Sequence, residues 1–591
     1  MGHESITAKR THLNPWLLPR NCRFALWMLL VLLTATILLF PVHLTYEYHP
    51  IQSLYIFDNL PLFGALFYIW LLSLLVLLFS GRSEARTDWE KMALVCISSL
   101  VFFAFWVVIL PYGRLDYMTN AGLVKVIQEE GMVPAGSTLY ADFPASHVMI
   151  LSLSQVTGLG IFDAVNLFLV CNALIFAALL YLLFSKAFES TSVAAFAAVM
   201  VMLGNQFLSR GYTFWPGLLS LVLVLAFLVV LTRGQHAYME TWQDRLMTLI
   251  LLVAATVMYF QASVLLLLVL VGMYLVQRLR KATPVAISTL CLFAVIPVAW
   301  EIYATVRAFP MLADYMSKIA DDIAGGTSLD WVPFLAKSNV GERFPLWVGM
   351  IRMSWWAAIF GLGSLLVLRN LLRVRELSLV ERVELGGLLG VIMLAALATL
   401  VSPGGERFIH FLHYAAFFTV PVLVRTSLNL GKRIKGYGFA LLVILCLVVS
   451  FPTFLVFNNK ICTDAFYPYS ISAGEFLERS YGIGEGLIVV NPDRVVGYYV
   501  PRSSAEAGYW YVGQAGNEDE FWQKADETAS GYSRTGQRVV FMVHESLKVT
   551  GEATQGISPT DPRWQGIENR IEDGLIDNSR EYDSGYVQIY Q

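Results

Sequence analysis

The sequence predicts an all-α polytopic membrane bundle of about 13 transmembrane helices, with a small α/β C-terminal extracytoplasmic domain. Three observations lead to this prediction. Hydrophobic residues make up 57% of the 591 positions and charged residues only 14%, whereas soluble domains carry about 25% charged residues. Apolar runs of about 17–23 residues recur, and each is long enough to cross a hydrocarbon layer of about 30 Å. Residues 459–591 are polar instead and contain short strand-like runs.

The apolar runs define the predicted spans and the boundary between two domains. The first run lacks a small-residue cleavage site, so we interpret it as a membrane anchor. The short runs 246–260 and 263–277 also fit a single broken hairpin. We expect a transmembrane domain over 1–458 and an extracytoplasmic domain over 459–591. The predicted spans are 24–44, 61–80, 92–111, 162–184, 192–206, 213–232, 246–260, 263–277, 284–303, 346–368, 384–402, 408–427 and 437–457.

The distribution of basic residues predicts the orientation. Lysine and arginine are concentrated in one set of loops, as in Arg278–Lys281 and Lys432–Lys435, and are sparse in the other set. The positive-inside rule makes the basic loops cytoplasmic. The sequence therefore predicts a multi-pass protein of the cell (plasma) membrane with a cytoplasmic N-terminus and an extracytoplasmic C-terminal domain.

The C-terminal segment has its own pattern. Strand-like runs lie at Gly486–Asn491, Arg538–Val543 and Gly585–Tyr590, and helix-like stretches lie at Ser472–Ser480 and Trp564–Asp573. About 130 residues are enough for a modest core. We therefore predict that this segment folds as a small α/β domain.

The first external loop carries the most informative polar residues. Asp116 follows directly after an apolar run, and a carboxylate at this depth must face water or take part in chemistry. We expect an amphipathic helix over 117–130 that stops at Gly131-Met132-Val133-Pro134. Asp142 and His147 precede a second apolar stretch, Val148–Leu159, which is too short to span a bilayer and suits the interface.

This order of residues resembles the first external loop of the GT-C glycosyltransferases. The resemblance rests on residues 112–161, where an acid, a helix, Gly-x-x-Pro, a Pro-containing turn with His147 and Gly158-Leu159-Gly160 follow one another, and on residues 402–414. GT-C enzymes have a multi-span helical fold and transfer a sugar from a polyprenyl-phosphate or polyprenyl-diphosphate donor. The resemblance implies a GT-C-like catalytic domain and a lipid-linked sugar donor.

The resemblance also implies roles for the acidic residues. Glycosyl transfer needs a base near the incoming oxygen and charge stabilisation for the departing phosphate. Asp116, Asp142 and His147 are the candidate catalytic residues. Asp116 either accepts the acceptor's proton or, with Asp142, holds a divalent metal ion such as Mg²⁺ or Mn²⁺. The alternative is that Asp116 only caps the following helix.

A second cluster supplies candidate ligands for the donor phosphate. Arg407 opens a helix at the external end of a span, where its guanidinium and the helix N-terminus both favour an anion. His410 lies one turn further along the same helical face. Arg352 is a third candidate. The alternatives are a packing network inside the bundle for Arg407 and His410, and snorkelling to the interface for Arg352.

One departure from the family narrows the expected substrate. Oligosaccharyltransferases carry a Trp-Trp-Asp-Tyr-Gly signature in their external domain. The nearest string here, Tyr509-Trp510-Tyr511-Val512-Gly513, lacks the acid and fits an aromatic strand. We therefore favour a monosaccharide on a single phosphate over transfer of whole oligosaccharides to asparagine. The expected acceptor is a glycan, a lipid or a protein, the surroundings are membrane lipids, and nothing indicates nucleic-acid binding.

Three alternative functions can be compared with this pattern. An outer-leaflet polysaccharide polymerase or ligase would use lipid-linked sugar and external arginines, although the C-terminal domain argues mildly against it. A transporter would show related halves and ionisable groups near mid-bilayer, whereas the sequence shows no such repeat and places its ionisable groups near one face. A non-catalytic scaffold is the third alternative.

Overall fold

The computed structural model describes most of the helical bundle and part of the C-terminal segment. The residues it describes are 19–39, 60–80, 87–104, 115–133, 142–203, 216–232, 241–279, 287–303, 361–373, 379–401, 406–433, 437, 439–444, 446–448, 450, 468–481, 487–490, 509–510, 538–544, 580–583 and 587–590. The structural statements below concern these residues.

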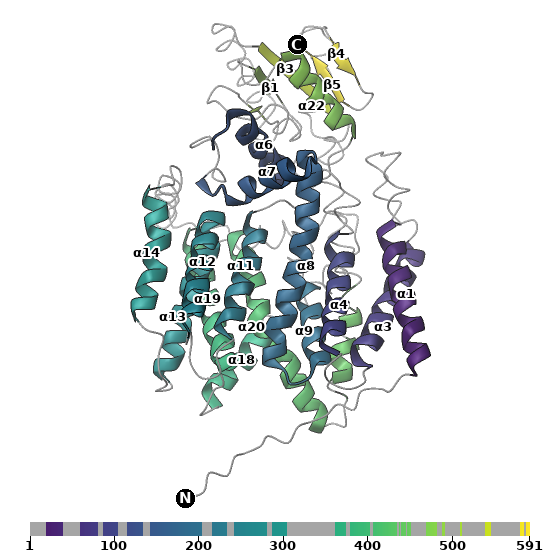
Figure 1. Ribbon diagram of the computed structural model, residues 1–591, viewed down its shortest axis with the longest axis vertical. Helices are drawn as coiled ribbons and strands as arrows, with labels where there is room; N and C mark the ends of the chain where they lie inside the picture. The colour runs from purple at the N-terminus through teal and green to yellow at the C-terminus, as the bar shows by residue number, and fades with distance from the viewer. Residues whose placement is uncertain are drawn as a thin grey trace, which may run out of the picture.

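Helices form a bundle that carries further helices and a small sheet at one end (Figure 1). We call this end the upper end and the opposite end the lower end. The first helices are α1 (Arg20–Leu39), α3 (Leu60–Phe79), α4 (Thr87–Ser99) with the π-helical η3 (Leu100–Ala104), α6 (Leu115–Glu130), α7 (Ala145–Thr157), α8 (Ile161–Ala187) and α9 (Thr191–Met202). The later helices are α11 (Pro216–Leu231), α12 (Trp242–Met258), α13 (Phe260–Leu279), α14 (Ile287–Tyr303), α18 (Gly363–Arg373), α19 (Leu379–Val401), α20 (Glu406–Arg433) and α22 (Pro468–Tyr481).

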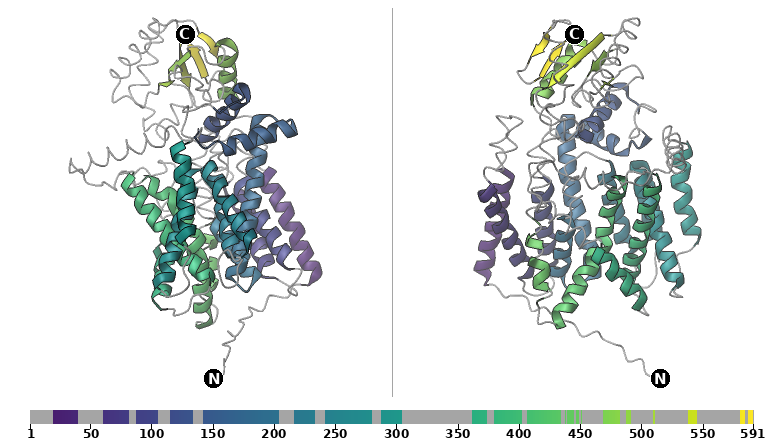
Figure 2. Two further views of the ribbon diagram at one scale, coloured as in Figure 1. Left: turned by 60° about the vertical axis from the view of Figure 1, so that its left-hand side comes forward. Right: turned by 180° about the vertical axis from the view of Figure 1, so that it is seen from behind.

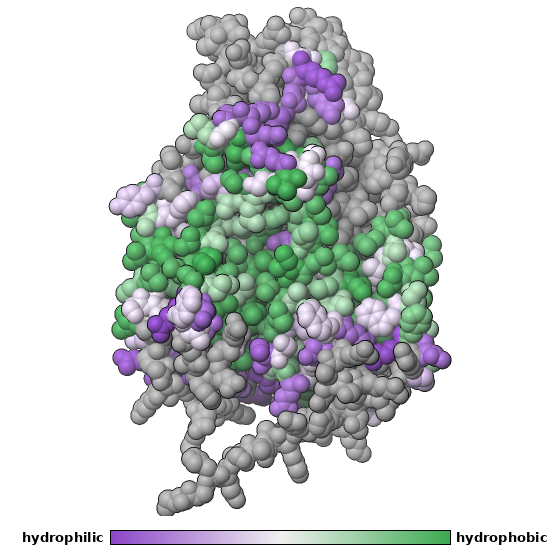
Figure 3. All heavy atoms as spheres, in the orientation of Figure 1, coloured by the Kyte–Doolittle hydropathy of each residue, from purple (hydrophilic) through white to green (hydrophobic). Residues whose placement is uncertain are grey.

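The bundle has the surface of a membrane protein. Among the described residues, three helices are long and apolar enough to cross a bilayer, at Asn21–Leu39, Leu62–Phe79 and Ile161–Ala187, and several shorter apolar helices accompany them. On the face that Figure 3 shows, a broad apolar belt crosses the middle of the bundle, with hydrophilic residues above and below it. Exposed side chains such as Leu32, Ile175 and Val295 contribute to the apolar surface. Such a surface is stable only in lipid, so the chain is a membrane protein.

The predicted spans agree with the helices to within a few residues where both are described. The segments 246–260 and 263–277 are separate helices, α12 and α13, and only Tyr259 lies between them in an extended conformation. Thr241 caps the start of α12, because its hydroxyl accepts a hydrogen bond from the Asp244 amide at 3.2 Å. The predicted span 346–368 lies largely outside the described residues, and only its end coincides with α18. The total number of spans stays a prediction.

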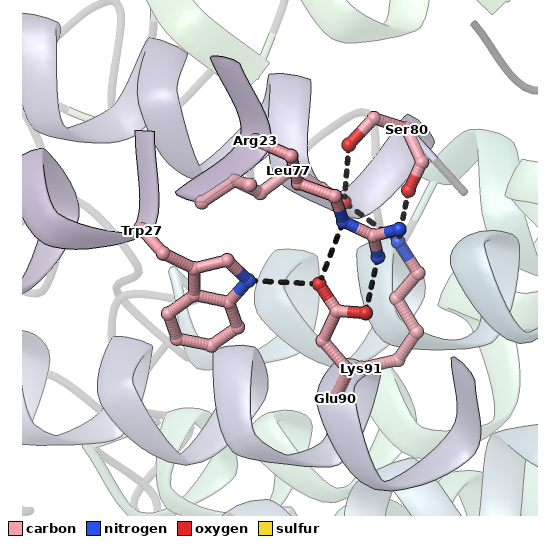
Figure 4. Close-up of polar contacts among 6 residues, drawn as sticks. All are labelled: Arg23, Trp27, Leu77, Ser80, Glu90 and Lys91. Atoms are coloured by element: carbon pink, nitrogen blue, oxygen red, sulfur yellow. Dashed lines mark hydrogen bonds and ion pairs between the residues drawn. The ribbon is translucent and has the colours of Figure 1, made fainter. Parts of the chain in front are cut away.

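A polar network closes the lower end of α1, α3 and α4 (Figure 4). The guanidinium of Arg23 pairs with both carboxylate oxygens of Glu90, and the Trp27 indole donates to the same carboxylate at 2.8 Å. Lys91 is 1% exposed, and its ammonium donates to the carbonyls of Leu77 and Ser80 at 2.6 and 2.9 Å. Lys91 thereby donates to two carbonyls at the C-terminal end of α3, where helix carbonyls lack partners within the helix itself.

A second network closes the lower end of α8, α19 and α20. Arg425 donates to both carboxylate oxygens of Glu384 at 3.1 and 3.0 Å and to the carbonyl of Ala187 at 3.4 Å. The guanidinium also lies 5.8 Å from the ring centroid of Phe188. Two-point contact of this kind fixes the relative register of the helices, because guanidinium and carboxylate match only in a narrow geometry.

Glycines allow α19 to pack closely against its neighbours. A Cβ added at Gly386 would lie 2.6 Å from the Met273 backbone nitrogen on α13, and one added at Gly390 would lie 2.7 Å from Leu268 backbone atoms. The spacing of four residues places both glycines on one face of α19. Small residues at this spacing let membrane helices approach so closely that van der Waals contact stabilises the pair. The core of the bundle therefore depends on α13 and α19 being in backbone contact.

The C-terminal segment adds a five-stranded sheet above the bundle. Its strands are β1 (Leu487–Val490), β2 (Tyr509–Trp510), β3 (Arg538–His544), β4 (Arg580–Asp583) and β5 (Val587–Tyr590). The strand order is β2-β1-β3-β5-β4, with β1 parallel to β2 and β3, and β5 antiparallel to β3 and β4. The predicted strands coincide with β1, β3 and β5, and the predicted helix at 472–480 lies within α22. The predicted helix at 564–573 lies outside the described residues.

Replacing Gly386 with alanine should destabilise the bundle. The added methyl group would overlap Met273, and overpacking of this kind typically costs about 1–3 kcal/mol. Thermal unfolding of the detergent-solubilised protein measures the effect. Gly361→Ala is the matched control, because nothing lies within 4 Å of a Cβ added there. Equal melting temperatures for the two variants would contradict the close packing of α13 and α19.

Candidate active site

Two helices, α6 and α7, lie over the upper end of the bundle and build the candidate site (Figures 1 and 2). Each ends at a glycine in the left-handed conformation: Gly131 follows α6 and Gly158 follows α7, both with φ of 71°. The amide of Gly131 donates to Ile127 and that of Gly158 to Ser154, at 3.0 and 2.8 Å. Glycine adopts this conformation without steric cost and stops a helix. The two predicted helices of the first external loop are therefore present.

A buried hydrogen bond joins α6 to α7. Nε2 of His147 lies 2.8 Å from Oδ1 of Asn120, and Nδ1 lies 3.4 Å from the Ser146 hydroxyl. All three residues are 0% exposed. With its proton on Nε2, the neutral ring donates to Asn120, and its Nδ1 can accept from Ser146. Because buried polar groups must be paired, this contact specifies how the two helices meet.

The burial of His147 determines its charge. Desolvation lowers the pKa of His147 to about 3, although a hydrogen bond to the Phe143 backbone opposes the shift. The ring is therefore neutral at physiological pH. A neutral ring without exposed surface, already paired with Asn120, suits the positioning of α7 better than direct contact with a substrate.

Asp142 lies in the turn that leads into α7. The residue is 4% exposed, and its carbonyl accepts a hydrogen bond from the Trp300 indole at 3.2 Å. The next residue, Phe143, packs edge-on against Tyr259 with ring centroids 6.3 Å apart. Trp300 belongs to α14, and Tyr259 lies between α12 and α13. The turn is thus tied to the upper ends of three bundle helices.

An apolar cavity opens next to this turn. Its volume is about 370 Å³, and it lies between α12 and α14. Trp300, whose indole holds the Asp142 carbonyl, is one of the lining residues. The others are Val253, Thr256, Val257, Ile296, Ala299 and Tyr303. The lining suits a hydrocarbon group better than a polar one.

The remaining predicted site residues are placed by their helices. Asp116 is the second residue of α6, one helical turn before Asn120. Arg407 and His410 lie in the first two turns of α20. The side chains of these three residues, and all of Arg352, lie outside the described residues.

The length of α20 nevertheless shows at which end of the bundle the backbone of Arg407 lies. Arg425 is bonded at the lower end and follows Arg407 by 18 positions on α20, which is roughly 27 Å at 1.5 Å per residue. That length approximates the thickness of a bilayer core. Arg407 therefore starts α20 near the upper end, where α6 also lies.

The structure does not test the proposed metal site. Among the side chains that it describes, no group of three or more His, Cys, Asp and Glu residues is arranged to hold a metal ion. The predicted pair of Asp116 and Asp142 includes a side chain outside that set. Metal binding by this pair stays a prediction.

Three residues at this site were missed by the sequence interpretation. Asn120 is the partner of His147, Trp300 holds the Asp142 turn, and Lys125 pairs with Glu478 of α22. Asn120 and Lys125 were visible only as polar positions on an amphipathic helix. Their partners lie on other helices, so spacing along the chain gave no signal for them.

The fold resembles that of solved membrane glycosyltransferases. One is the archaeal oligosaccharyltransferase AglB from Archaeoglobus fulgidus, in complex with an inhibitory peptide and a dolichol-phosphate; it is 13% identical, with a TM-score of 0.50 over 80% of this chain and 71% of AglB. Another is ArnT from Cupriavidus metallidurans bound to undecaprenyl phosphate, which is 15% identical, with a TM-score of 0.41 over 86% of this chain and 98% of ArnT. No family model matches the sequence, and no curated protein matches it.

The likeness to AglB concerns the fold. The expected multi-span helical fold is therefore confirmed, for a chain whose sequence is only 13% identical to AglB. The reaction of this chain is a separate question, because one fold can carry different functions.

Acidification should destabilise the protein through His147. Below the ordinary pKa of about 6.5 the unfolded chain binds a proton at this position, whereas the folded chain does so only near pH 3. Stability is therefore fully present above about pH 6.5 and is lost as the pH falls through this window. Melting temperatures between pH 7.5 and 4.5 measure the loss. In His147→Gln the dependence on pH should be shallower, and an unchanged slope would contradict the assignment.

Proposed function

We propose that this protein is an integral membrane glycosyltransferase that transfers a sugar from a polyprenyl-phosphate donor to an acceptor on the extracytoplasmic face. One observation carries the proposal: an acid occupies the first turn of a helix that is fixed over the upper end of a GT-C-type bundle. Arg407 lies in the first turn of another helix, near the same end. An acid and an arginine near one rim are the charges that glycosyl transfer requires.

The reaction is a single displacement at the anomeric carbon. The acceptor hydroxyl oxygen forms a bond to that carbon while the bond from the carbon to the phosphate oxygen breaks. Asp116 accepts the proton of the hydroxyl, and the phosphate departs with the bonding electrons, still attached to the polyprenyl chain. Arg407 and His410 bind this phosphate, with Arg352 as a further candidate. Such a displacement inverts the anomeric centre.

Other residues of the site have supporting roles. His147 positions α7 through Asn120, and Trp300 holds the turn that contains Asp142. The cavity next to Trp300 offers apolar surface for part of the donor's hydrocarbon chain. Asp142 remains the candidate partner of Asp116 if the acid holds Mg²⁺ or Mn²⁺ instead of accepting a proton. Loss of activity on chelation, with recovery on adding Mn²⁺, would favour the metal-binding role.

We keep the membrane orientation and the donor class that the sequence predicts. Described basic residues such as Arg23, Lys91 and Arg425 lie at the lower end, which supports a cytoplasmic lower end by the positive-inside rule. Residues 459–591 then form an extracytoplasmic domain. Tyr509 and Trp510 form the strand β2, as proposed for the string that lacks the oligosaccharyltransferase acid. The missing acid in this string, rather than the strand, favours a monosaccharide donor on a single phosphate.

Asp116→Asn should abolish sugar transfer while leaving expression intact. Removal of a positioned base typically costs about 10²- to 10⁴-fold in rate. The assay follows the release of polyprenyl phosphate from polyprenyl-phosphate monosaccharides by mass spectrometry. Asp163→Asn is the matched control, because Asp163 is an exposed first-turn acid of α8, directly after α7. Equal activity of both variants and the unmodified protein would rule out a catalytic role for Asp116.

Arg407→Ala should weaken donor binding. A charge-assisted hydrogen bond contributes about 1.5–3 kcal/mol, so the KM for the lipid-linked donor should rise roughly tenfold or more. Arg407→Lys should recover part of the loss, since lysine keeps the charge but not the two-point geometry. Arg479→Ala, on the exposed side of α22, serves as the control. A donor KM that stays unchanged in Arg407→Ala would exclude contact with the phosphate.

A further inference from the structure

The middle of α6 is covered on all sides. Residues 120–127 include no exposed position, and Asn120, Ala121, Val124 and Ile127 are among those that are fully or nearly fully buried. Eight consecutive residues pass through more than two turns, so every face of the helix is packed. Exposure begins only in the last turn, at residues 128–130. A helix that only rested on the bundle would keep one side exposed.

Two different parts of the chain contact α6. On one side α6 packs against α7 and α8 of the bundle. On the other side lies the C-terminal unit, which we define as α22 with β1–β5, and Figure 1 shows α22 above α6. Lys125 of α6 forms an ion pair with Glu478 of α22. The two residues are 353 positions apart in the sequence.

Glu478 belongs to a helix that is itself held in place. Ala473 and Leu477 of α22 are 0% exposed, they lie one turn apart on one face, and α22 packs against β5. Glu475 pairs instead with Arg479 of its own helix, on an exposed side. Glu478 alone among these charged residues reaches α6. Packing against the sheet therefore holds α22, and with it Glu478, in position for the ion pair.

The surroundings make this pair stronger than an ordinary surface contact. The side chains of Lys125 and Glu478 are only 12% and 27% exposed, and loss of one partner would take a directly bonded opposite charge away from the other, partly buried charge. Burial raises the pKa of Glu129, the positive charge of Lys125 opposes this, and the negative charges of Glu478 and Glu130 add to it. Lys125 is thus the cation shared by a local group of acids.

We infer that the Lys125–Glu478 ion pair is a positioning contact through which the C-terminal unit fixes α6, and with it Asp116, over the bundle. Lys125 follows Asp116 by nine residues on the same helix, which is about 13 Å along the axis. A tilt of α6 at Lys125 therefore moves its first turn. Asn120, between the two positions, is bonded to α7, so α6 is held at two points. The contact itself is independent of the proposed function. Only the effect of the contact on sugar transfer through Asp116 rests on the proposed function.

The test combines a structural readout with a kinetic one. Glu478→Gln should make the peptide 115–130 exchange its amide hydrogens faster, because α6 loses one of its two fixed points. The kcat of sugar transfer should fall about tenfold or more with little change in the donor KM, since misplacing a reacting group by about 1 Å can cost 10²-fold. The charge swap Lys125→Glu with Glu478→Lys should restore both. Glu475→Gln, on the same helix, should change neither.

The exchange measurement separates this inference from the proposed function, because it requires no sugar transfer. Unchanged hydrogen exchange of 115–130 in Glu478→Gln, or no recovery in the charge swap, would overturn the inference whatever the protein catalyses. Unchanged kcat with faster exchange would overturn the link to Asp116. If the unmodified protein transfers no sugar, the proposed function fails, while the exchange results still support or overturn the contact.

Discussion

The hydrogen bond between Asn120 and His147 is the interaction on which the arrangement of the candidate site depends. Both side chains are 0% exposed, so breaking this hydrogen bond would cost free energy that contact with water could not recover. This cost favours the arrangement in which α6 and α7 meet. The first turn of α6 and the turn at Asp142 acquire their relative positions from that constraint.

The two ends of the bundle differ in how their polar groups are satisfied. At the lower end, Arg23 with Glu90 and Arg425 with Glu384 form paired networks that join neighbouring helices. These networks stabilise the packing of the helices, because each of these charged side chains is paired with an opposite charge on a neighbouring helix. At the upper end, α6, α7 and the C-terminal unit cover the helices, and the polar contacts there join elements outside the bundle core. The candidate active site lies at the upper end, which is built from α6, α7, the C-terminal unit and the ends of the bundle helices.

Close packing inside the bundle holds its helices in fixed relative positions, and the elements at the upper end depend on those positions. Gly386 and Gly390 bring α19 into backbone contact with α13, and Gly387 faces the ring of Phe418 on α20. In lipid no hydrophobic force drives helices together, so van der Waals contact at small residues carries much of the association. The helix α20 begins near the upper end and is bonded at Arg425 near the lower end. This packing therefore also limits how far the start of α20, with Arg407, can move.

The sequence by itself determined the class of fold, the limits of most helices, and the two helices of the first external loop, because apolar run length and glycine stops are local properties of the chain. It also indicated Asp116, Asp142, His147 and Arg407 as polar positions that deserve a role. Only the tertiary structure decided that His147 is buried against Asn120 and that Lys125 meets a residue 353 positions away. Such partners are set by how whole helices pack, and no local pattern encodes that geometry.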